Sequence, residues 1–89
     1  MDQKFKEILK KWVKDIYRDR SFKESDFENL ISDEETINSL GGDSLDTTML
    51  LIDIEDEYKI EIDDEEAEEL DIRNMQFKQL NEIVNLRKK

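Results

Sequence analysis

The sequence predicts an all-α protein, an up-and-down bundle of three longer helices and one short helix with a long first loop. Two observations support this class. Apolar residues recur at helical spacing in three separate stretches, near residues 3–18, 44–58 and 75–87. Gly41 and Gly42, the two glycines of the chain, directly precede the second stretch and mark the turn into it.

The first helix, near residues 3–18, has a complete amphipathic pattern. Steps of three and four residues place seven apolar side chains on one stripe, namely Phe5, Ile8, Leu9, Trp12, Val13, Ile16 and Tyr17. Lysine and acidic residues fill the opposite face. Because an aromatic side chain in such a stripe usually packs in a core, we expect Trp12 to be largely buried.

A long connection, residues 19–43, follows the first helix. Loops of this length are uncommon in compact domains unless they pack through their own side chains or serve a function. We expect a short helical turn near Ser25–Ile31. The apolar residues of the loop are expected to pack into the core; they are Phe22, Phe27, Leu30, Ile31, Ile37 and Leu40.

Ser44 stands at the boundary between this loop and the second helix. Gly41 and Gly42 allow the backbone to turn sharply and leave the approach to Ser44 uncrowded. Asp43 or Ser44 can cap the helix by accepting a hydrogen bond from a free backbone N–H. At this place a serine hydroxyl is in water, and the unpaired N–H groups and the helix dipole favour an attached anion.

The second helix, near residues 44–58, has apolar residues on two faces. Helical geometry gathers the expected core residues on one face, namely Thr47, Leu50, Leu51, Ile54 and Tyr58. The opposite face carries Leu45, Met49 and Ile52, surrounded by acidic residues. An apolar spot rimmed by charges is typical of a partner-binding surface, although single exposed apolar residues are also common.

A short element comes next. Lys59–Ile62 is expected to be extended, and Asp63 or Asp64 to cap a brief helix through about Leu70. The acidic residues in the first turn of that helix suit its dipole. They do not form a calcium-binding loop of the EF-hand type, because the Asp-x-Asp-x-Asp-Gly spacing is absent. We therefore predict no specific metal site.

The last helix is predicted near residues 75–87, with Asn74 as its N-cap. The basic residues at its end suit the helix dipole. One face carries the apolar residues Phe77, Leu80, Ile83, Val84 and Leu86.

Charge is unevenly distributed along the chain. The formal net charge is −11, with +3 in residues 1–20, −18 in residues 21–72 and +4 in residues 73–89. Such acidity disfavours binding to nucleic acid and insertion into an anionic membrane. Because it is concentrated around Ser44, it would attract basic surfaces of partner proteins, and it also serves solubility.

The missing residue types exclude several kinds of chemistry. Histidine and cysteine are both absent, so no Ser-His-Asp or Cys-His arrangement and no disulfide can form. No apolar run approaches the length of a membrane span, and the first residues lack a signal-peptide pattern. We therefore predict a non-enzymatic, cytoplasmic protein in which residues 1–89 form one domain.

The stretch Leu40–Thr47, with the sequence LGGDSLDT, closely resembles the modification site of acyl carrier proteins. The resemblance continues through Glu55–Tyr58 and Ile60–Glu68, and so covers roughly residues 37–70. In that family the serine of the motif carries 4′-phosphopantetheine through a phosphodiester, and the cofactor thiol carries an acyl group between enzymes. Family members are usually monomeric.

This resemblance implies roles for particular residues. Ser44 would be the attachment site, with Asp43 and Leu45 beside it, modified from coenzyme A by a separate phosphopantetheinyl transferase. The family docks its second helix on partner enzymes, here those with basic docking surfaces that load or use acyl groups. The implied partner-binding residues are Leu45, Asp46, Thr48, Met49, Ile52, Asp53, Glu55 and Asp56. The implied acyl pocket, which otherwise consists of core residues, is formed by Leu51, Ile54, Ile62, Ala67 and Leu70.

The resemblance leaves several functions open. An acyl carrier would serve fatty-acid, lipid or polyketide synthesis. Met49 and Asp53 stand where the family often has a glutamate and a small residue, which indicates a specialised rather than a housekeeping carrier. A peptidyl or aminoacyl carrier is the first alternative, although the acidity and the Asp-Ser-Leu-Asp motif favour an acyl carrier. In the second, an unmodified acidic adaptor, Asp43 and Ser44 would merely cap the helix.

Overall fold

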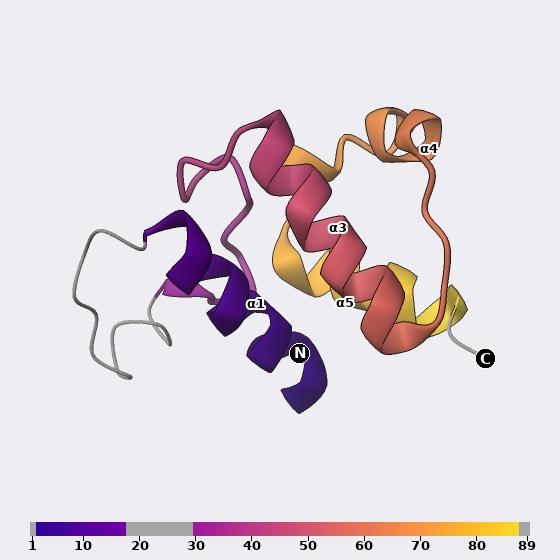
Figure 1. The fold of residues 1–89 in the computed structure, drawn as a ribbon, viewed down its shortest axis with the longest axis horizontal. Helices are drawn as coiled ribbons and strands as arrows, with labels where there is room; N and C mark the ends of the chain where they lie inside the picture. Colours follow the sequence, from indigo (N-terminus) through magenta and orange to yellow (C-terminus); the bar gives the residue numbers. More distant parts are fainter. Residues whose placement is uncertain (1, 18–29, 88–89) are drawn as a thin grey trace.

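The computed structural model describes residues 2–17 and 30–87 of the chain. The elements in these residues are α1 (Gln3–Ile16), α3 (Ser44–Tyr58), α4 (Asp64–Glu69), the 3₁₀ turn η1 (Ile72–Asn74) and α5 (Phe77–Arg87). Helices α1 and α3 run side by side in opposite directions, and α5 lies behind α3 (Figure 1). The predicted all-α class and helical bundle are confirmed.

The core forms where α1, α3 and α5 face one another. Trp12 is fully buried at this place, as predicted. Its ring meets the ring of Phe77 edge-on, with centroids 6.4 Å apart and planes at 83°. The remaining buried residues of the three helices are Phe5, Ile8, Leu9, Val13, Leu50, Leu51, Ile54, Tyr58, Leu80, Asn81 and Val84.

The long first loop contributes buried residues to this core. Ile31, Ile37 and Leu40 are all buried, which confirms that they pack inward. Leu30 is half-buried against the core. Phe22, Phe27 and most of the helical turn predicted near Ser25–Ile31 lie outside the described residues.

One helix end and one core position differ slightly from the prediction. Helix α1 ends at Ile16, and the backbone N–H of Tyr17 donates to Val13 O at 3.0 Å. In α3 the predicted bounds are correct, but Thr47 is only half-buried on the core face. The lysine after the helix, Lys59, adopts the left-handed conformation with φ of 58°, and this ends α3.

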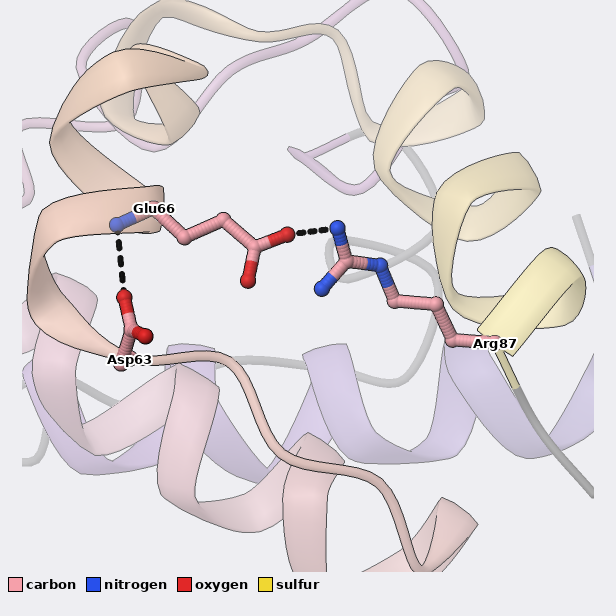
Figure 2. A network of polar contacts seen from close by, with 3 residues as sticks. All are labelled: Asp63, Glu66 and Arg87. Atoms are coloured by element: carbon pink, nitrogen blue, oxygen red, sulfur yellow. Dashed lines mark hydrogen bonds and ion pairs between the residues drawn. The ribbon is translucent and has the colours of Figure 1, made fainter.

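Helix α4 is short and is connected to the end of α5. Asp63 is its N-cap, since the Asp63 carboxylate accepts a hydrogen bond of 2.8 Å from the Glu66 backbone N–H. The Glu66 side chain then pairs with the Arg87 guanidinium on α5 (Figure 2). Both side chains are about one-third exposed, so this ion pair contributes little to stability.

The start of the last helix was predicted wrongly. Asn74 does not cap it: Asn74 ends η1, and its side-chain amide donates to the Asp71 carboxylate at 3.0 and 3.2 Å. Helix α5 begins at Phe77, whose backbone N–H donates to Glu35 O at 2.9 Å. A carbonyl of the first loop therefore satisfies the helix start, a long-range contact that local sequence does not reveal.

The apolar face of α5 is also narrower than predicted. Phe77, Leu80 and Val84 are buried and Ile83 is half-buried, but Leu86 is 86% exposed. Two residues correspond to about 200° of helical rotation, so Leu86 points away from the side on which Val84 is buried.

Candidate functional site

The turn before α3 requires both glycines, for different reasons. Gly41 has a φ of +84°, in the left-handed region that residues with a side chain rarely adopt. Gly42 is buried, and a Cβ there would lie 2.6 Å from Ile37 Cγ2 and 3.3 Å from Trp12 Cζ2. The backbone at Gly42 therefore passes directly over the core, and this close approach fixes where α3 begins.

Asp43 caps α3 through a reciprocal pair of hydrogen bonds. Its carboxylate accepts from the Asp46 backbone N–H at 2.9 Å, and the Asp46 carboxylate accepts from the Asp43 N–H at 3.1 Å. Of the two predicted caps, the structure thus selects Asp43 over Ser44. The pKa of Asp43 lies below its ordinary value, chiefly because the Asp46 N–H stabilises the carboxylate, and to a lesser extent because of the Arg73 charge.

Two aromatic side chains, Trp12 of α1 and Tyr17 just after α1, form hydrogen bonds to this turn. The indole Nε1 of Trp12 donates to Asp46 O at 2.8 Å, inside the first turn of α3. The hydroxyl of Tyr17 donates to Leu40 O, just before the glycine pair. Sequence reasoning placed both aromatics in the core stripe and missed these bonds, because a helical pattern does not indicate where a polar ring atom is directed.

Arg73 also forms hydrogen bonds to this turn and to the loop before it. Its side-chain Nε donates to Gly42 O at 2.9 Å, and its backbone O accepts from the Asn38 N–H at 2.9 Å. Sequence reasoning assigned this residue no role. The sequence does mark Arg73 as a basic residue after a strongly acidic segment, since residues 21–72 hold two basic residues and twenty acidic ones.

Ser44 is the first residue of α3 and is exposed. Its backbone O accepts a hydrogen bond of 3.0 Å from Thr48 Oγ1, as Asp43 O does from Thr47 Oγ1 at 2.9 Å. Within the described part of the chain, the Ser44 hydroxyl itself has no hydrogen-bond partner. Because Asp43 provides the cap, the hydroxyl is free to react with a reagent that arrives from solvent.

A cavity of about 410 Å³ opens beside Ser44, between α3, α4 and η1. It brings together only part of the predicted acyl pocket. Leu51 and Ala67 border the cavity, whereas Ile54, Ile62 and Leu70 do not. Ile54 and Ile62 are buried in the core, and Leu70 packs against the core from a half-buried position.

The predicted partner-binding face is open to solvent at its three apolar positions. Leu45, Met49 and Ile52 are 68%, 39% and 52% exposed, which confirms that they point away from the core. Around them, Thr48 and Asp56 are exposed and Asp46, Asp53 and Glu55 are half-buried.

The acidic residues around this face are not equally available for contact with a partner protein. The Asp46 carboxylate is engaged in the cap of α3. Asp53 and Asp56 border a groove of about 270 Å³ that they share with Lys4 and Lys11 of α1. The lysines therefore offset part of the negative charge along this edge of α3.

Comparison with known families matches residues 3–86 to the family described as "Phosphopantetheine attachment site". The chain belongs to this family. Acyl carrier proteins from three strains of Buchnera aphidicola subsp. Acyrthosiphon pisum (Tuc7, 5A and APS) are each 49% identical to it over 43 residues. Those residues are 48% of this chain and 54% of each relative, so the match spans about half of their length. No solved structure matches the chain.

Family membership implies a covalently attached 4′-phosphopantetheine and a carrier rather than a catalyst. The described residues contain no group of three or more histidine, cysteine or acidic side chains arranged to hold a metal ion. None of the described helices combines the length and the apolarity that crossing a membrane requires.

Proposed function

We propose that this protein is an acyl carrier and that Ser44 is its attachment site for 4′-phosphopantetheine. The observation that carries the proposal is the exposed Ser44 hydroxyl, free of hydrogen bonds to the described residues, at the first position of α3. The site also fits the group, since the hydroxyl borders a cavity that includes the cationic side chain of Arg73. When bound, the cofactor supplies the thiol that this cysteine-free chain lacks.

In the attachment reaction this chain is the substrate of a separate Mg²⁺-dependent phosphopantetheinyl transferase. The Ser44 oxygen attacks the β-phosphate of coenzyme A, so that an Oγ–P bond forms while the P–O bond to the nucleotide breaks. The hydroxyl proton passes to a base on the transferase. Asp43 serves instead to fix the helix start, because its carboxylate accepts the Asp46 N–H.

The exposed side of α3 is the proposed docking surface for the transferase and for the enzymes that load and use acyl groups. Leu45, Met49 and Ile52 provide an apolar centre, and the surrounding acidic residues would attract basic partner surfaces. Met49 and Asp53 favour a specialised carrier with dedicated partners in fatty-acid, lipid or polyketide synthesis. We expect it to act as a monomer in the cytoplasm.

The cavity beside Ser44 is the proposed entrance for an acyl chain. Leu51 and Ala67 already border it. Ile54, Ile62 and Leu70 would join the lining only if the packing between α3 and α4 loosened. Helix α4 suits such movement, because it has only six residues and none of them is buried.

The attachment site is tested by intact mass after incubation with coenzyme A, Mg²⁺ and a broad-specificity transferase. We expect the wild type to gain one phosphopantetheine and Ser44→Ala to gain none. Ser32→Ala, which removes another exposed hydroxyl, is the matched control and should be modified like the wild type. If several transferases leave the wild type unmodified, the carrier function is wrong and the acidic adaptor remains.

The docking surface is tested by replacing an exposed leucine within it and another outside it. Leu45→Glu places a charge in the apolar centre and should slow modification by about tenfold or more, as expected for a central interface residue. Leu86→Glu is the matched control, because Leu86 is even more exposed but lies on α5. Equal rates for the two variants would contradict this assignment of the docking surface.

A further inference from the structure

Arg73 is attached at two points to the loop that leads to Ser44. Its backbone O accepts from the Asn38 N–H, and its side-chain Nε donates to Gly42 O, each at 2.9 Å. The bond through Nε fixes the plane of the guanidinium group and leaves the two terminal nitrogens for other partners. Among the described residues, Arg73 forms no ion pair that would occupy them.

The Arg73 guanidinium places a positive charge among the carboxylates around the cavity beside Ser44. Among the described residues, three carboxylates border the cavity, from Asp64, Glu68 and Asp71, and Arg73 is the single basic residue there. An anionic group attached at Ser44 would be repelled by these carboxylates and by nearby Asp43. Of the described side chains at this cavity, that of Arg73 carries the positive charge that can offset this repulsion.

Arg73 also affects the pKa of a residue next to Ser44. The pKa of Asp43, directly before Ser44, is lowered mainly by the hydrogen bond from the Asp46 N–H, and the positive charge of Arg73 adds a smaller effect in the same direction. The guanidinium thus acts electrostatically on the turn to which the phosphate would be attached.

We propose that Arg73 is a positioning residue for the phosphodiester on Ser44, an inference that rests on the proposed carrier function. The terminal guanidinium nitrogens donate to the non-bridging phosphate oxygens, while Nε stays on Gly42 O. This contact holds the root of the pantetheine arm over the cavity between α3 and α4. The planar guanidinium suits two parallel hydrogen bonds to a phosphate, which a lysine ammonium cannot reproduce.

The proposal is tested on the modified protein by phosphorus NMR. Wild type, Arg73→Gln, Arg73→Lys and the control Lys78→Gln are each loaded with phosphopantetheine, and their ³¹P resonances are compared with that of the urea-unfolded protein. Lys78→Gln removes one positive charge from an exposed position on α5, away from the cavity. The guanidinium resonances of wild-type Arg73 are also compared before and after modification.

We expect Arg73→Gln to move the ³¹P resonance most of the way to its unfolded position, and Lys78→Gln to leave it at the wild-type position. Arg73→Lys should lie between, because it retains the charge without the paired hydrogen bonds. A purely structural role would make Arg73→Lys and Arg73→Gln alike, since both lose the bond from Nε to Gly42. The guanidinium resonances of the wild type should shift on modification.

The proposal is overturned if all four ³¹P resonances coincide and the Arg73 resonances do not change on modification. Should both Arg73 variants fail to fold, the comparison of unmodified and modified wild type still decides. Failure of the carrier function gives a different result, because the wild type then takes up no phosphopantetheine.

Discussion

The close approach of Gly42 to the core gives a sharp prediction for Gly42→Ala. The added Cβ would lie 2.6 Å from Ile37 Cγ2 and 3.1 Å from Ile37 O. Ile37 is fully buried and its Cγ2 is attached at the stiff Cβ branch, so the contact cannot be relieved by a side-chain rotation alone. Overpacking of this kind costs about 1–3 kcal/mol.

A smaller term opposes that cost. Alanine restricts the unfolded chain, which stabilises the folded protein by about 0.5 kcal/mol where the backbone conformation is compatible. The net loss for Gly42→Ala is therefore about 1.5 kcal/mol of unfolding free energy. For a domain of this size, the melting temperature should fall by about 6–12 °C. Thermal and urea unfolding followed by circular dichroism measure both quantities.

A double-mutant cycle identifies the responsible contact. Ile37→Leu removes Cγ2 while keeping the side-chain volume, so Gly42→Ala should cost much less in that background. Gly41→Ala is the matched control: among the described residues its Cβ would meet only Tyr17 Oη, at 4.0 Å, but its φ of +84° costs an alanine about 1–2 kcal/mol. Ile37→Leu should not rescue that variant. A Gly42→Ala protein as stable as the wild type, or a cycle without coupling, would refute the reasoning.

Three further predictions concern the contacts around the site. Trp12→Phe removes the indole donor to Asp46 O and shrinks a fully buried ring, so urea unfolding should show a loss of about 2–3 kcal/mol. Because its pKa is lowered in the folded state, Asp43 stabilises the protein above its ordinary pKa and loses that effect as the pH falls through the lowered value. The difference in melting temperature between wild type and Asp43→Asn should therefore shrink on acidification; a difference independent of pH would contradict this. Arg87→Gln breaks the ion pair with Glu66 at a partly exposed position and should cost about 0.5 kcal/mol in low salt, and nothing measurable in high salt.

Much of the fold was predictable because it depends on local patterns. The apolar stripe over Phe5–Tyr17 identified α1, and the turn residues Gly41–Asp43 correctly placed the start of α3. Local capping chemistry also identified Asp63 as one of two candidates for the start of α4. These features involve residues only a few positions apart, so the sequence itself reports them.

The start of α5 shows where local patterns fail. Asn74 has the chemistry of a helix cap, but its amide is used by Asp71. The N–H of Phe77 instead finds its acceptor in the first loop, at Glu35 O. Which of two acceptable starts a helix uses depends on such tertiary acceptors, and a single local stretch does not contain that information.

The candidate site divides in the same way. The sequence by itself determined that a serine stands at a helix start after two glycines, and that Leu45, Met49 and Ile52 point outward. Only the tertiary structure decided what holds that serine in place. The bonds from Trp12 to Asp46 and from Arg73 to Gly42 join residues 34 and 31 positions apart. Helical periodicity fixes which way a side chain faces along its own helix, but the partner of its polar atom is set by how distant elements pack.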